Sequence, residues 1–80
     1  MSKLRRLNLR SKEYTGNTEF PQCLSRSYFM IIMTDGTGTI EFGGAGGAIP
    51  LSTDSFYEPY VAPTSAISVV TEGTFVVVEG

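Results

Sequence analysis

The strongest constraint on the fold is the segment 65–80, in which two apolar runs flank the pair Glu72-Gly73. An acidic residue followed by glycine supplies the positive φ values of a two-residue hairpin turn. Because side chains of a strand alternate between faces, the predicted hairpin has two apolar faces. One face holds Ile67, Val69, Val76 and Val78, and the other holds Val70, Phe75 and Val77. We expect the rest of the chain to cover the first face, and a partner or a second copy to cover the other.

A second hairpin is predicted over residues 27–42, around Asp35-Gly36. The motif Thr34-Asp35-Gly36-Thr37 recurs as Thr71-Glu72-Gly73-Thr74, which suggests two similar hairpins stacked as layers. The predicted fold is therefore all-β: a small β-sandwich or barrel built from two hairpins plus edge strands, with an extended N-terminal arm. Its predicted core consists of Phe29, Ile31, Met33, Ile40, Phe42, Ile67, Val69, Val76 and Val78.

The charge is divided along the chain. All six basic residues lie within positions 1–26, together with two acids, so that this part carries +6 − 2 = +4. Residues 27–80 contain six acids and no base, which gives −6. We interpret residues 1–26 as a basic arm and connector, and residues 27–80 as the sandwich or barrel domain. Such a division suits an arm that docks on an acidic surface or on the acidic body of another copy.

The arm supplies the first group of predicted partner-binding residues: Leu4, Arg5, Arg6, Leu7 and Arg10. The leucines favour binding, because a purely solvating tail has no use for them. A solvated tail is the alternative, and the pattern leaves open whether the arm is helical or extended. Residues 13–26 are expected to be connecting structure, with Cys23 buried as a small apolar residue.

Residues 49–63 contain three prolines and an aromatic cluster that includes Tyr57 and Tyr60. Tyrosines beside prolines offer large contact areas at low entropic cost, as interface anchors do. These two tyrosines, together with Val70, Phe75 and Val77 of the second hairpin face, complete the predicted partner-binding set. An edge strand that merely caps the sandwich is an equally weighted interpretation of the segment 49–63.

Several kinds of chemistry are not predicted. The sequence has no histidine, the side chain best suited to proton transfer at neutral pH, and one cysteine, which can form no intrachain disulfide. We therefore predict neither enzymatic activity nor a cofactor or metal site. No run approaches the ~18 apolar residues of a membrane span. Arginines interrupt the N-terminal leucines where a signal peptide would be apolar, so synthesis in the cytosol is expected.

The Gly-rich stretch 43–47, Ile49-Pro50-Leu51, Val61-Ala62-Pro63 and the closing hairpin 67–78 follow one another along the chain. This pattern resembles the accessory virion proteins of tailed bacteriophages, which include capsid decoration or cement proteins and related head or tail components. The resemblance implies a non-enzymatic structural protein, made in the host cytoplasm and located in the virion. Its implied partners are the major capsid protein or another virion protein, and further copies of itself in a homo-oligomer.

Nucleic-acid binding is the alternative from another functional class. The basic arm could contact phosphates, and an open barrel with Tyr57 and Tyr60 could stack bases. After Arg26, however, the body has no lysine or arginine to follow a nucleic-acid backbone. Binding would rest on the arm alone and would be weak and sensitive to salt.

Overall fold

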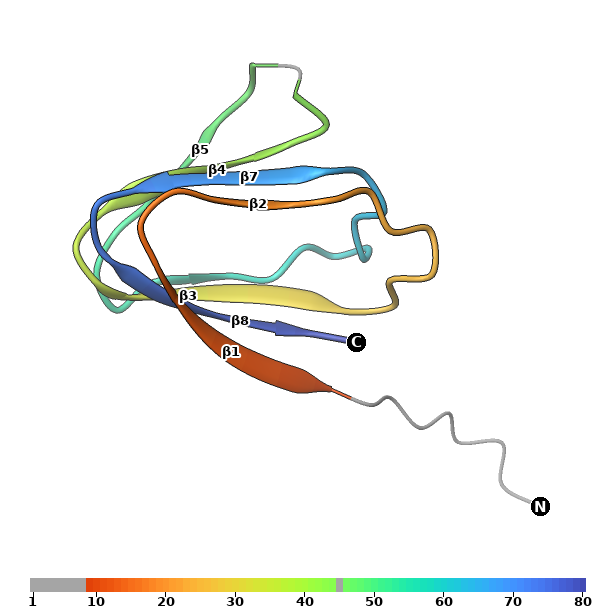
Figure 1. The fold of residues 1–80 in the computed structure, drawn as a ribbon, viewed down its shortest axis with the longest axis horizontal. Coiled ribbons are helices and arrows are strands. Elements are labelled where there is room, and N and C mark those ends of the chain that lie inside the picture. Colours follow the sequence, from red (N-terminus) through yellow and green to blue (C-terminus); the bar gives the residue numbers. More distant parts are fainter. Residues whose placement is uncertain (1–8, 45) are drawn as a thin grey trace.

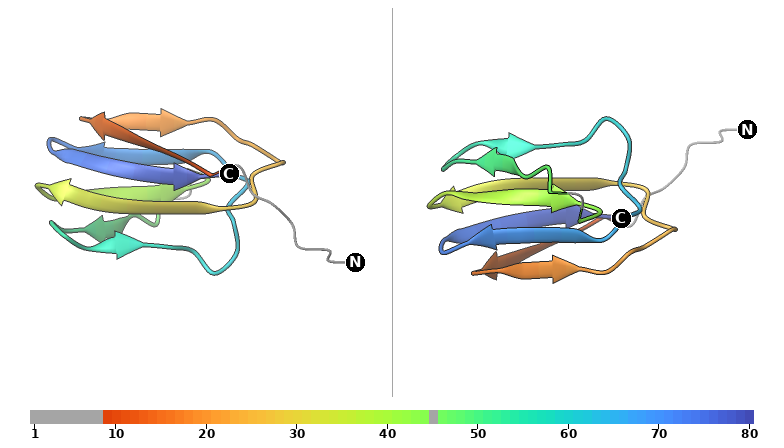
Figure 2. Two further views of the ribbon diagram at one scale, coloured as in Figure 1. Left: turned by 90° about the horizontal axis from the view of Figure 1, so that it is seen from below. Right: turned by 90° about the horizontal axis from the view of Figure 1, so that it is seen from above.

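The computed structural model describes residues 9–44 and 46–80, and its regular structure there is entirely β. Two four-stranded antiparallel sheets lie one over the other (Figures 1 and 2). Sheet A has the order β1-β8-β3-β6, and sheet B has the order β2-β7-β4-β5. The strands are β1 (Arg10–Thr15), β2 (Thr18–Phe20), β3 (Phe29–Asp35), β4 (Gly38–Phe42), β5 (Ile49–Leu51), β6 (Phe56–Tyr57), β7 (Ile67–Thr71) and β8 (Thr74–Glu79). The predicted all-β sandwich is confirmed. In the described part of the chain, no helix has the length and apolar character to span a membrane.

Four short connections cross from one sheet to the other at the same end of the sandwich, which we call the turn end (Figure 1). They join β1 to β2, β3 to β4, β5 to β6 and β7 to β8. The opposite end, called the loop end, holds the longer connections 21–28, 43–48 and 58–66. The predicted pairing within each hairpin is therefore wrong, because β3 pairs with β8 and β6, and β4 pairs with β7 and β5. Because the two strands of each predicted hairpin lie in different sheets, their inner side chains face each other and are buried across the core.

The two repeated turn motifs pack directly on each other at the turn end. Gly36 has a φ of 90°, and a Cβ on Gly73 would lie 1.9 Å from the carbonyl oxygen of Asp35. The Gly16 N–H donates a hydrogen bond of 3.0 Å to the Gly73 carbonyl, so the β1–β2 turn joins the same contact. The glycines are thus required by close approach of backbones as well as by turn geometry.

The core lies between the sheets and is mostly the predicted one. Its buried apolar side chains are Phe20, Phe29, Ile31, Met33, Ile40, Leu51, Ile67, Val69, Phe75 and Val77, and Phe42 packs against them while partly exposed. The prediction is wrong for β8, where Val76 and Val78 point outward, and Phe75 and Val77 point inward. A two-residue hairpin would have placed Val69 and Val76 on one face. Because β7 and β8 instead face each other across the core, residues 69 and 77 share the interior.

The N-terminal part of the sandwich begins earlier than expected. Strands β1 and β2 add an edge to each sheet, so residues 13–20 are not connecting structure and the sandwich starts at Arg10 rather than Ser27. The expectation holds for residues 21–26, which belong to the connection between β2 and β3. Cys23 in that connection is partly exposed, so the prediction that it is buried is wrong.

Candidate protein-contact surface

The outer face of sheet A carries a continuous apolar strip. Met30 pairs with Val78, and Ile32 pairs with both Val76 and Phe56. Directly opposed residues of an antiparallel sheet project to the same side, and their neighbours along each strand are buried inside. We call Met30, Ile32, Phe56, Val76 and Val78 the outer strip. Four of its members are partly exposed and Phe56 is 62% exposed. The left panel of Figure 2 looks onto this sheet from outside.

The outer face of sheet B is different in character. Glu19 pairs with Ser68, and Ser68 pairs with Glu41, which gives an acidic and polar row across β2, β7 and β4. Val70 pairs with Thr39 beside that row and is 56% exposed. The two faces of the sandwich therefore offer different surfaces, one with a continuous apolar strip and one with a polar row that contains two acids.

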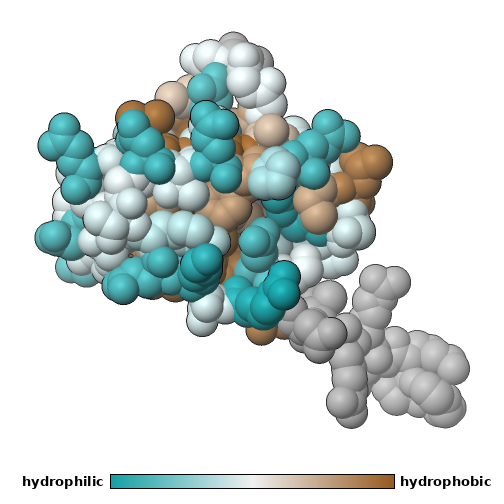
Figure 3. Space-filling model, in the orientation of Figure 1, coloured by the Kyte–Doolittle hydropathy of each residue, from teal (hydrophilic) through white to brown (hydrophobic). Residues whose placement is uncertain are grey.

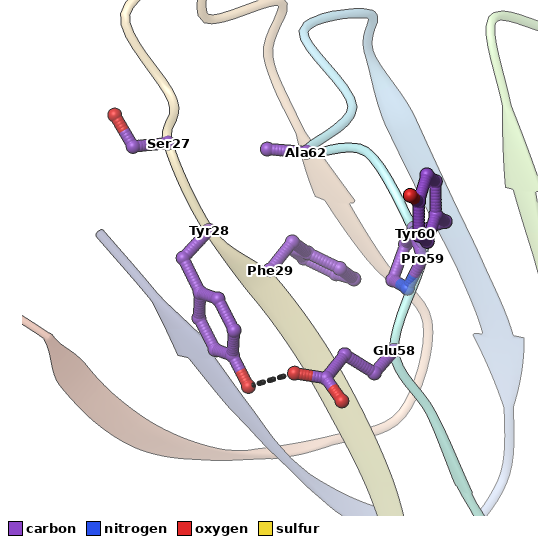
Figure 4. A pocket seen from close by; sticks show the side chains of 7 residues that line it. All are labelled: Ser27, Tyr28, Phe29, Glu58, Pro59, Tyr60 and Ala62. Carbon is purple, nitrogen blue, oxygen red and sulfur yellow. Dashed lines mark hydrogen bonds between the residues drawn. The ribbon is translucent and has the colours of Figure 1, made fainter.

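A pocket of about 340 Å³ opens at the loop end of the outer strip. Its lining residues are Ser27, Tyr28, Phe29, Glu58, Pro59, Tyr60 and Ala62 (Figure 4). Ile31 pairs with Tyr57, so Pro59 falls opposite Phe29 in the same register. Proline has no N–H to donate, and the β3–β6 ladder stops there and leaves the gap.

The Tyr28 hydroxyl closes one side of this gap by donating a 2.5 Å hydrogen bond to the Glu58 carboxylate (Figure 4). That bond holds the phenol proton and, with some burial and the charge of Glu58, raises the pKa of Tyr28 above its usual 10.0. Both side chains project on the outer side of sheet A, because they follow the alternation of Met30 and Phe56. At its loop end the outer strip is thus bordered by an acidic group that a tyrosine holds in place.

Arg26 fixes the conformation of the loop end. Its side chain is buried, and its guanidinium donates to the carbonyls of Pro63 (2.6 Å), Ser65 (3.2 Å) and Pro21 (3.3 Å). The same group forms an ion pair of 3.4 Å with Glu79. These contacts tie the connections 21–28 and 58–66 to each other and to the end of β8. Arg26 is therefore an internal tie between loops and is not a free charge of the arm.

The tied loops present apolar side chains to solvent. Leu24 projects from the connection 21–28, and Tyr60 and Val61 project from the connection 58–66. Figure 3 shows hydrophobic surface at this end, at the right of the view. We call Leu24, Tyr60 and Val61 the loop-end tip. Side chains on loops held by several hydrogen bonds lose little freedom when a partner covers them.

The predicted partner-binding residues are spread over the molecule. Leu4, Arg5, Arg6 and Leu7 lie outside the described residues. Arg10 is exposed at the start of β1, and Tyr60 is exposed at the loop end, whereas Val70 lies on the outer face of sheet B. Tyr57 is partly buried, with its ring 6.0 Å from that of Phe42.

The prediction that Phe75 and Val77 face outward is wrong, because both are fully buried in the core. The residues that sequence reasoning missed are those of the outer strip and the Tyr28–Glu58 pair. One signal was present: Met30 and Ile32 alternate with the buried residues of β3. Assigning Val76 and Val78 to the same surface required knowing which strand pairs with β8.

Two observations on the described residues concern metal-binding and reactive side chains. No group of three or more His, Cys, Asp or Glu that could hold a metal occurs within 9–44 and 46–80. The pKa of the Cys23 thiol is lowered, chiefly because the Ser25 side chain and backbone hydrogen-bond to the sulfur.

The fold defines a two-sheet antiparallel β-sandwich, and comparison with known proteins agrees at that level. No family model and no curated protein matches the sequence. Among solved structures, an RmlC-like cupin protein from Desulfovibrio desulfuricans superimposes with a TM-score of 0.60 at 16% sequence identity. The match covers 90% of this chain and 69% of that chain. At this identity the likeness shows the fold alone.

Proposed function

We propose that this chain is a non-enzymatic virion structural protein, which decorates or cements a bacteriophage capsid, or a head-tail component, through protein–protein contacts. The observation that carries the proposal is the loop-end tip, where Leu24, Tyr60 and Val61 stand in solvent on loops tied by Arg26. Burying a large apolar side chain contributes about 1.5–3 kcal/mol. The three tip residues together contribute about 5–9 kcal/mol before the cost of association, so the tip supplies one anchor among several contacts on a repeating protein surface.

The location in a virion rests on the sequence resemblance and on the division of charge. A small β unit with a basic arm and an acidic body can contact several subunits of a lattice at once. Many copies bound side by side gain affinity from simultaneous contacts without any single strong site. The proposed partner is accordingly the major capsid protein or another protein of the particle.

Co-sedimentation with purified tailed-phage capsids tests this function. The chain offers a matched pair of variants, because Val61 of the loop-end tip is 70% exposed and Val70 on sheet B is 56% exposed. We expect Val61→Asp to reduce the pelleted fraction at least tenfold, since a charge would have to be desolvated in the contact. Val70→Asp should pellet like the wild type.

Three outcomes would count against this proposal. Wild-type protein that stays in the supernatant contradicts the capsid as partner. Loss of pelleting by Val70→Asp, with Val61→Asp unaffected, contradicts the loop-end tip and favours the acidic face of sheet B. Equal losses of pelleting in both variants contradict the assignment of the capsid contact to a single surface. Circular dichroism of both variants verifies that each remains folded.

One observation supports nucleic-acid binding as a second candidate. A cleft of about 370 Å³ along β1 is lined by Arg10, Lys12 and Tyr14, and the Lys12 ammonium lies 5.3 Å from the Tyr14 ring centroid. Basic groups beside an aromatic ring are the elements of single-strand binding. Glu79 also lines the cleft and opposes phosphate. A titration with single-stranded DNA at physiological salt decides the matter, and tight binding there would favour this candidate.

A further inference from the structure

We propose that the outer strip of sheet A and the Tyr28–Glu58 pair at its end bind the basic N-terminal segment, residues 3–9, of a second copy, so that copies exchange their arms. This inference deepens the proposed function by naming a partner and its receptor surface. It rests on the proposed function only in that the chain works by binding protein.

Charge complementarity is the first argument. Acidic side chains flank the strip on both sides: Glu13 pairs with Val76 from β1, and Glu58 follows β6. The strand residues on this outer face include no lysine or arginine. Because residues 27–80 contain no base and Arg26 is already paired, the uncommitted positive charges of the chain lie in its first 12 residues. A guanidinium from that segment can pair with the Glu58 carboxylate.

The spacing of the leucines in the arm matches the spacing of the two apolar rows of the strip. In an extended segment Arg5, Leu7 and Leu9 lie on one face, about 6.7 Å apart in sequence order. Glu58 falls opposite Met30, so the row nearer the loop end is Glu58, Met30 and Val78, and the next row is Phe56, Ile32 and Val76. With Leu7 and Leu9 laid on these two rows, Arg5 lies one step nearer the loop end, at the level of Tyr28, and its long side chain can turn back to the Glu58 carboxylate that Tyr28 holds.

The area of contact supports an exchange of arms over a simple stacking of faces. Four strands about 4.8 Å apart and about 23 Å long give a face of only about 440 Å² per copy, below the ~800 Å² of a stable interface. The seven residues 3–9, as unfolded chain, expose about 1,100 Å². Burying a third of that on each of two arms removes about 1,500 Å² in all, counting both surfaces, which lies in the range of specific interfaces.

The direction of the chain indicates a neighbouring copy. Arg10 pairs with Glu79 at the loop end, and β1 runs from there toward the turn end. The chain therefore enters β1 from beyond the loop end of its own sheet. To cover its own strip the chain would have to reverse direction immediately before Arg10, and Asn8 is the one residue next to that point that favours a turn. A strip on another copy requires no such reversal.

Charge reversal in the full-length chain tests the exchange without deleting anything. Mass is measured by light scattering at about 100 µM, where an interface of this size keeps the wild type at 2 × 8.7 = 17.4 kDa or a larger ring. Arg5→Glu and Glu58→Arg each place like charges together, and each is expected to raise the dissociation constant at least tenfold. Glu19→Arg reverses an exposed acid on the other sheet and serves as the matched control, with no change expected.

The decisive sample is an equimolar mixture of the Arg5→Glu chain and the Glu58→Arg chain. In exchanged copies, the altered arm of the first meets the altered site of the second, and the unaltered arm meets the unaltered site. Both contacts are then matched, so the mixture should regain the wild-type mass. An arm bound to its own sheet would leave both chains mismatched, and mixing would change nothing.

Each alternative result overturns the exchange. A monomeric wild type at 100 µM, a mixture that is not restored, or equal effects of Glu19→Arg and Glu58→Arg would each do so. The proposed function can fail or survive separately, since capsid pelleting depends on Val61 and can be measured on the Arg5→Glu chain. Pelleting that is lost with Val61→Asp and kept with Arg5→Glu in a monomer would leave the function standing and the exchange refuted.

Discussion

Arg26 shows how much one side chain contributes to this small sandwich. Its guanidinium meets three backbone carbonyls and the Glu79 carboxylate, and it lies 5.7 Å from the Phe29 ring centroid. A buried cation is stabilising only when nearly all of its donors are satisfied, and here four contacts achieve that. The loop-end tip depends on this residue, because the connections 21–28 and 58–66 meet through it.

Replacing Arg26 with methionine is predicted to lower the free energy of unfolding by about 2–4 kcal/mol, because buried carbonyls and the Glu79 carboxylate lose their partner. Arg10→Met, which removes an exposed base at the same end, should cost less than about 0.5 kcal/mol. Urea denaturation followed by circular dichroism measures both. Equal losses in the two variants would show that the buried contacts of Arg26 contribute nothing beyond charge.

At the scale of the element, β8 decides which side chains are available for contact. It lies between β1 and β3, so its outward residues occupy the centre of sheet A. Phe75 and Val77 fill the core, and Val76 and Val78 belong to the outer strip. A register shift of one residue in β8 would turn Phe75 and Val77 outward and Val76 and Val78 inward.

Two neighbouring valines of β8 test this assignment with the same substitution. Val77→Thr places a hydroxyl in the core without a partner and is predicted to destabilise the fold by about 1–3 kcal/mol. Val76→Thr places it on the partly exposed outer face, where the cost should be below about 0.5 kcal/mol. Thermal and urea unfolding of both variants give the comparison. A larger loss for Val76→Thr would reverse the assigned faces.

The sequence predicted the elements that depend only on local alternation. The inner residues of β3, β4 and β7, such as Ile31, Ile40 and Val69, follow directly from an apolar residue at every second position. The face of β8 could not be predicted in this way, because Glu72-Gly73 fits a two-residue hairpin as well as a connection between sheets. That choice is made by long-range pairing with β1 and β3, which no local pattern encodes.

The contact surface was predictable to a similar extent. Tyr60 and Arg10 were named from their chemistry and are exposed at the loop end or beside it. The prediction that the last hairpin leaves Val70, Phe75 and Val77 outside is wrong for β8, because Phe75 and Val77 are buried. Identifying Val76 and Val78 as the outward residues of β8, joined to Met30 and Phe56, required the register between β8, β3 and β6. No feature of the sequence indicated that Arg26 would connect two loops, because it was assigned with the other basic residues to the segment 1–26.

For the whole molecule, the pairing pattern links the ends of the described chain. β1 and β8 are neighbours in sheet A, with Arg10 opposite Glu79, and only β4 and β5 are consecutive strands that pair. The first and last strands therefore depend on each other, although they are far apart in sequence. Folds dominated by such non-local pairs form slowly compared with helical bundles of the same size.

Circular permutation is predicted to succeed if the ends are joined where the sheet already brings them together. A short Gly-rich linker from Gly80 to Leu9 closes β8 onto β1, whose paired Cα atoms lie about 5 Å apart. New ends between Gly46 and Gly47 fall in an exposed connection at the loop end. This permutant omits residues 1–8 and should unfold cooperatively, with a loss of about 1–2 kcal/mol from cutting the β4–β5 connection.

The matched control is a second permutant, whose new ends lie between Glu72 and Gly73, where the backbones of two turns are in contact. That cut frees the turn end at the point where the sheets are held together, so this permutant should lose substantially more stability than the first. Calorimetry and urea unfolding of the pair measure the difference. If the 72/73 permutant were the more stable of the two, or if only the 46/47 permutant failed to fold, the close packing of the turn end would not be what unites the two sheets.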